Sequence, residues 1–87
     1  MTCTQDPRID IGHGVTVEVR RLDGVIIGVA YTHTCNGFHV EGWVPVKPEA
    51  PDGWDLVSEN PLTLSPSLLC RACGHHGFVR DGRWIPC

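Results

Sequence analysis

The chain has 87 residues, a formal net charge of −3 and 20% charged residues. A single domain of this length buries little apolar surface, so a metal ion or disulfide bonds are expected to supplement its core. The acidic excess argues against binding to nucleic acid through its phosphates, and no stretch approaches the roughly twenty apolar residues of a membrane span. We therefore predict one cytosolic domain, residues 1–87, without a membrane partner.

The first half of the chain predicts an antiparallel hairpin. Valines alternate with polar residues from position 15, Asp23-Gly24 is a hairpin turn signal, and an apolar run follows. These features predict a hairpin over 15–31, in which Gly28 marks a bulge or a close backbone approach. Residues 1–12 are expected to be loosely ordered, as chain ends often are.

Shorter elements are predicted in the second half. Residues 38–44 and 54–57 have the composition of strands, and Ser65-Pro66 is a common start for one turn of helix. A second Asp-Gly turn predicts a hairpin over 77–85 directly after a pair of cysteines. The predicted fold class is mainly β, a small antiparallel sheet resembling a zinc ribbon.

Two cysteines in Cys-x-x-Cys spacing predict a metal site. Cys70 and Cys73 can wrap one ion in a tight turn, and Gly74 supplies the positive φ that such turns use. In a reducing cytosol this spacing is more often a metal clamp than a structural disulfide. Cys35 is the third predicted ligand and Zn²⁺ the predicted ion, which places the zinc-bearing half at residues 32–87. The remaining cysteines, Cys3 and Cys87, are near the chain ends and are expected to be bystanders.

The fourth ligand is predicted to be a histidine. His76 is favoured because it continues a Cys-x-x-Cys-x-x-His spacing, and His33, two residues before Cys35, is the alternative. His75 and His39 are further candidates by position alone. Three cysteines and one histidine would close the coordination shell, whereas a catalytic zinc keeps an open position. The sequence also lacks a metalloprotease motif, a phosphate loop and a serine elbow, so we predict that the protein is not an enzyme.

Three segments of the second half resemble a known family. Residues 63–68 read Thr-Leu-Ser-Pro-Ser-Leu, residues 70–78 contain Cys-x-x-Cys-Gly-x-His-Gly-Phe, and residues 81–84 read Asp-Gly-x-Trp. These motifs resemble small uncharacterised proteins that are common in actinobacteriophages and their prophages. They are also similar to a broader bacterial family of unknown function, sometimes encoded beside ubiquitin-like conjugation genes. The resemblance places the motif cysteine and histidine at Cys73 and His76.

The resemblance and the predicted metal site together suggest a function. We expect a phage-encoded, zinc-stabilised accessory module that binds a host or phage protein and is not catalytic. One alternative is a virion component, such as a capsid decoration protein, which would form a homo-oligomer. A weaker alternative is a zinc ribbon that binds nucleic acid. The expected location is the host cytoplasm or the virion.

Overall fold

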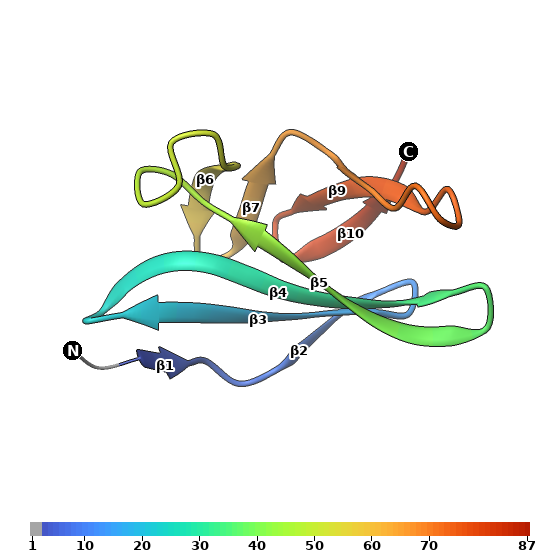
Figure 1. The fold of residues 1–87 in the computed structure, drawn as a ribbon, viewed down its shortest axis with the longest axis horizontal. Helices are drawn as coiled ribbons and strands as arrows, with labels where there is room; N and C mark the ends of the chain where they lie inside the picture. The colour runs from blue at the N-terminus through green and yellow to red at the C-terminus, as the bar shows by residue number, and fades with distance from the viewer. Residues whose placement is uncertain (1–2) are drawn as a thin grey trace.

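A computed structural model describes residues 3–87, and side chains from Asp6 onward; every regular element in this range is a β-strand (Figure 1). The large sheet contains β1 (Cys3–Gln5), β2 (Ile9–Gly12), β3 (Val15–Leu22), β4 (Val25–Cys35) and β5 (Phe38–Pro45). A two-stranded sheet contains β6 (Asp55–Glu59) and β7 (Leu62–Ser65). The small sheet contains β8 (Leu68–Leu69), β9 (His76–Arg80) and β10 (Arg83–Pro86). Along residues 3–87 we find no helix that could cross a membrane.

The predicted mainly β class is confirmed, and strands pair at both predicted hairpins. β3 pairs with β4, and β9 pairs with β10, in each case antiparallel. Residues 3–12, for which the sequence predicted loose order, contain β1 and β2, and both strands pair with β3. The turn of helix predicted after Ser65-Pro66 is absent. The chain instead stays extended there because Leu68 and Leu69 pair with β9.

The large sheet has the strand order β1-β3-β4-β5, with β2 also paired to β3. The register of β3 and β4 shifts between Arg20 and Arg21, opposite Gly28, so the predicted bulge is present. Gly28 also lies under the indole of Trp43, because a Cβ at that position would be 2.3 Å from the ring. The glycine therefore provides both the bulge and the close approach.

The core lies between the large sheet and the strands that cross it, β6 to β10 (Figure 1). Alternation in β3 buries Val15, Val17 and Val19, and the facing strands contribute Leu64 and Trp84. β7 and β9 bury alternate residues, as expected for a period of two, whereas the central strand β4 has buried residues on both faces. This arrangement leaves the opposite face of the large sheet in contact with solvent.

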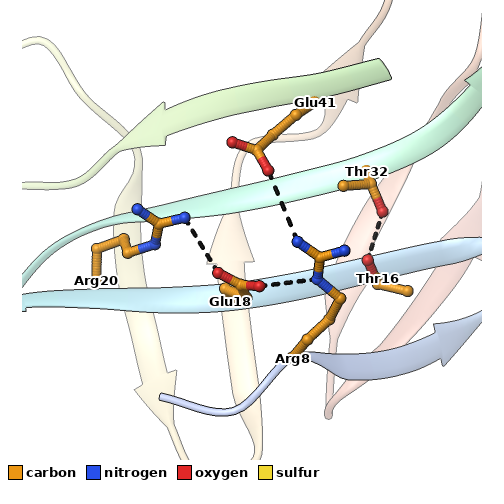
Figure 2. Close-up of polar contacts among 6 residues, drawn as sticks. All are labelled: Arg8, Thr16, Glu18, Arg20, Thr32 and Glu41. Atoms are coloured by element: carbon orange, nitrogen blue, oxygen red, sulfur yellow. Dashed lines mark hydrogen bonds and ion pairs between the residues drawn. The ribbon is translucent and has the colours of Figure 1, made fainter. Parts of the chain in front are cut away.

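That opposite face is polar and is tied together by charges, as Figure 2 shows. Glu18 accepts a hydrogen bond from Arg8 Nε at 2.8 Å and another from Arg20 Nη2 at 3.0 Å. Arg8 also lies 3.9 Å from Glu41 on β5, and the hydroxyls of Thr16 and Thr32 are hydrogen-bonded across β3 and β4. Arg8 thus connects the segment before β2 to two strands of the sheet, β3 and β5.

Candidate catalytic dyad and metal-ligand group

A tight turn joins β8 to β9 and contains the Cys-x-x-Cys motif. The carbonyl of Cys70 accepts a hydrogen bond from the Gly74 N–H at 2.8 Å, and the Cys70 N–H donates to the His75 carbonyl at 2.8 Å. Gly74 has a φ of 76°, which its missing side chain permits. The turn therefore directs both cysteine side chains to one place.

Four side chains converge at this turn, and we call them the metal-ligand group: His33, Cys35, Cys70 and Cys73. His33 and Cys35 come from the end of β4, two residues apart, so both face the core. The ligand atoms lie within 4.8 Å of one another, with Cys35 Sγ 3.7 Å from Cys70 Sγ and Cys73 Sγ 3.6 Å from His33 Nε2. This group could hold a metal ion.

The thiols of the group differ in how readily they ionise. The pKa of Cys35 is raised to about 12, chiefly by its hydrogen bond with Cys73 and then by burial. Backbone hydrogen bonds from Cys73 and Ala72 lower the pKa of Cys70 instead. Burial lowers the pKa of His33, which keeps its imidazole neutral and able to bind a metal. Crowded thiols resist ionising together, and a bound cation removes that penalty.

Aromatic rings hold His33 in place. Its imidazole stacks on Tyr31, with centroids 5.4 Å apart, and on His75, at 4.6 Å. His75 in turn stacks on Trp84 at 4.6 Å. The side chains of His33 and Trp84 are each 3% exposed, so the stack belongs to the core. His75 therefore supports the metal-ligand group from inside.

The next residue, His76, points the other way. Successive residues of a strand face opposite sides, so His75, Gly77 and Val79 face the core while His76 and Phe78 face outward. His76 Nε2 lies 2.8 Å from Ser67 Oγ. The sequence favours His76 as the fourth metal ligand, with His33 as the alternative. The structure places His33 beside the three cysteines, whereas His76 contacts Ser67.

Strand pairing explains how Ser67 reaches His76. Leu69 is opposite His76 in the register of β8 and β9, so Ser67, two residues earlier, lies diagonally across from the imidazole on the same face. Leu68, between Ser67 and Leu69 in the chain, is buried. The Trp54 indole N–H donates a hydrogen bond to the Ser67 carbonyl at 3.3 Å. These contacts fix the backbone from which the hydroxyl projects. We call Ser67 and His76 the dyad.

Both dyad residues are partly exposed, and no acid partner of His76 is found among the described side chains. Among residues 6–87, no carboxylate forms a hydrogen bond or an ion pair with His76. A cavity of about 440 Å³ lies between β2, β3 and the turn from β6 to β7, where Arg21 joins Asp6 and Glu59. Its lining includes neither dyad residue. The side chain of Cys3 is outside the described residues, and Cys87 is exposed.

A hydroxyl hydrogen-bonded to an imidazole is the minimal arrangement of a serine hydrolase, here on a small all-strand domain. The family model of bacterial ubiquitination-like system serine proteases, BubE, matches residues 9–87, and the chain belongs to this family. No curated protein and no solved structure matches the chain.

Membership of a serine protease family overturns two predictions from the sequence, the non-catalytic accessory module and the absence of enzymatic activity. Both predictions treated the histidines as metal ligands and did not consider Ser67. The signal was present, because Ser67 and His76 both lie in the segments that carry the family resemblance, nine residues apart. The phage origin stays a prediction.

Proposed function

We propose that the chain is a serine peptidase of a bacterial ubiquitination-like system, with Ser67 as nucleophile and His76 as general base. The contact between Ser67 Oγ and His76 Nε2, at 2.8 Å, carries this proposal. A distance of about 2.6–3.2 Å is what proton transfer between nucleophile and base requires. Family membership supports the reaction class. The substrate is a polypeptide, and the substrate protein is the partner we expect.

The dyad would act in two half-reactions. Ser67 Oγ attacks the carbonyl carbon of the scissile bond while its proton moves to His76 Nε2, and the imidazolium then donates this proton to the leaving amine. The acyl group remains on Ser67 as an ester. A water molecule then attacks the ester and gives a proton to His76, and Oγ leaves and takes that proton back. For the first transfer His76 carries its hydrogen on Nδ1, so that Nε2 can accept.

The metal-ligand group is suited to zinc. A tetrahedral zinc with Zn–S bonds of about 2.3 Å and Zn–N bonds of about 2.0–2.1 Å separates two sulfurs by about 3.8 Å and a sulfur from a nitrogen by about 3.6 Å. The separations in the group are 3.7 Å between two sulfurs and 3.6 Å between sulfur and nitrogen. Four protein ligands leave no open position, so a bound zinc would supply structural stabilisation and no chemistry at the scissile bond.

The group also positions the dyad. Ser67 precedes the β8–β9 turn and His76 follows it, while Cys70 and Cys73 in the turn face His33 and Cys35 of β4. An ion bound there would fix the turn to the large sheet and so hold the two strands that carry Ser67 and His76. The metal site and the dyad are therefore coupled through the eight residues between Ser67 and His76.

Labelling with a fluorophosphonate carrying a fluorophore tests the proposed nucleophile, because this probe phosphonylates activated serines. We expect labelling of the wild-type protein at Ser67, located by mass spectrometry, and none in Ser67→Ala. His76→Ala should lower the rate by about a thousandfold, within the range that a general base contributes. Ser65→Ala, an exposed serine of the same segment, is the matched control and should label normally. Undiminished labelling of Ser67→Ala would refute the proposal.

A further inference from the structure

The edge of the small sheet next to Ser67 is open. The strand order is β10-β9-β8, and among residues 3–87 no strand pairs with the other side of β8. Sheet edges with free N–H and C=O groups bind extended peptides as added strands. β8 is only two residues long, so its open edge is confined to the immediate neighbourhood of the dyad.

The hydrogen-bond pattern shows which main-chain groups face this edge. The Cys70 N–H donates to the His75 carbonyl, so the pair formed by Leu69 and His76 is a non-hydrogen-bonded pair of the antiparallel ladder. The N–H and C=O of Leu69 therefore point away from β9. The His76 carbonyl likewise points away from β8 and accepts from Cys87 at 3.0 Å. Leu69 consequently presents one donor and one acceptor to solvent.

The neighbouring position on the same edge is already occupied. The Ser67 carbonyl is two residues from Leu69 and points to the same side, but it accepts from the Trp54 indole at 3.3 Å. A strand added to β8 can pair with Leu69 but meets Trp54 beside Ser67. It cannot continue in the plane of the sheet there, and a turn toward the face of Ser67 Oγ and His76 would bring it to the dyad.

We propose that Leu69 is the docking residue for the substrate main chain: an extended segment of the substrate pairs with its N–H and C=O and so brings the scissile carbonyl to Ser67 Oγ. This inference rests on the proposed peptidase function and adds how the substrate is held. Recognition through main-chain groups suits a dyad that lies apart from the 440 Å³ cavity beside Arg21, whose lining contains neither Ser67 nor His76. The occupant is thus an extended stretch of polypeptide whose main chain is free to pair.

Two phosphonate probes separate docking from chemistry. A simple alkyl fluorophosphonate needs the dyad alone, whereas acetyl-trialanyl diphenyl phosphonate also offers peptide N–H and C=O groups. Leu69→Pro removes the outward N–H without removing a bond of the sheet, and proline is tolerated at such edge positions. Leu69→Ala keeps the N–H and is the reference. We expect Leu69→Pro to react about fivefold to tenfold more slowly than Leu69→Ala with the peptidyl probe, the cost of one hydrogen bond, and equally fast with the alkyl probe.

The same peptidyl probe, N-methylated at each amide in turn, provides a second measurement on the wild-type protein. One position should slow the reaction by a similar factor, because the methyl group blocks pairing with the Leu69 carbonyl. Equal rates for Leu69→Pro and Leu69→Ala with the peptidyl probe would overturn the proposal. If Leu69→Pro slows the reaction with both probes, the N-methyl series decides between two roles of the Leu69 N–H. If no N-methylated position then slows the reaction, the Leu69 N–H contacts the reacting oxygen of the probe, and the docking proposal is overturned. Failure of the peptidase function itself would appear differently, as labelling that survives Ser67→Ala.

Discussion

The large sheet and the small sheet are stabilised in different ways. β4 has eleven residues and β3 eight, and their alternating valines bury one face continuously. β8 has two residues and β9 five, which is too little for a sheet of that size to be stable by itself. The small sheet depends on the shared core, to which it contributes Leu68, Val79 and Trp84, and the metal-ligand group and the stacked rings of His33 and His75 lie beside it.

This difference bears on the position of the proposed catalytic dyad. A dyad requires two side chains held within hydrogen-bond distance, and cross-links near the site fix them better than a distant core does. Ser67 and His76 are on the two strands that the Cys70–Cys73 turn joins. The large sheet supplies the other two members of the metal-ligand group, His33 and Cys35, from the end of its longest strand.

Loss of one cysteine ligand should have the largest effect on stability of the substitutions considered. We expect Cys73→Ser to abolish metal binding and to lower the free energy of unfolding on the order of 5 kcal/mol, because metal binding contributes directly to folding. Elemental analysis and thermal melting check this, with the exposed Cys87→Ser as control. Labelling of Ser67 by the fluorophosphonate should disappear with the metal. A Cys73→Ser protein with full metal content and unchanged melting would rule out the site.

Replacing one glycine by alanine in each sheet compares how readily the two sheets accommodate an added methyl group. A Cβ at Gly77 would lie 2.6 Å from the Ile85 carbonyl oxygen and 2.6 Å from the Trp84 ring, whereas a Cβ at Gly28 meets only the half-exposed Trp43 ring. Backbone cannot move aside as easily as a surface ring. We expect Gly77→Ala to cost about 3 kcal/mol and Gly28→Ala about 1 kcal/mol in denaturant unfolding. Equal costs would mean that the small sheet is as adaptable as the large one.

The sequence predicts the central hairpin of the large sheet, β3 and β4, well because its signals are local. Alternating valines and the Asp23-Gly24 turn specify the hairpin without information from elsewhere in the chain. The convergence of Cys35 with Cys70 and Cys73 could also be predicted, since thiols at such spacing have few other uses in a reducing cell.

The dyad could not be predicted in the same way. β8 is a strand only because β9 pairs with it, and without that register nothing places Ser67 beside His76. The roles of the two histidines depend on which face of β9 each occupies. Strand alternation could have assigned them, because an inward Val79 at the predicted second hairpin requires an inward His75 and an outward His76.

The two histidines should give opposite results when replaced. His75→Ala removes a ring stacked between His33 and Trp84 and should lower the free energy of unfolding by about 1–2 kcal/mol, while Ser67 still reacts with fluorophosphonate below the melting transition. His75→Phe keeps a ring in the stack and should recover much of the stability. His76→Ala should leave melting nearly unchanged and remove labelling. The reverse result would show that the face assignment of β9 is wrong.

The smallest effect is expected on the polar face of the large sheet, where Glu18 is 7% exposed and bonded to two arginines. The hydrogen bond from Arg8 is the main cause that holds the pKa of Glu18 below its ordinary value of 4.5. The ionised form therefore stabilises the fold above pH 4.5, and this contribution is lost as the pH falls through the lowered pKa. Glu18→Gln should melt at a lower temperature than wild type at pH 7, and the two should converge at acid pH. Because protonation of the metal-ligand group affects both proteins alike, the difference between their melting temperatures isolates Glu18. A difference that stays constant down to pH 3 would mean that Glu18 contributes through its shape and packing, and that its charge is irrelevant to stability.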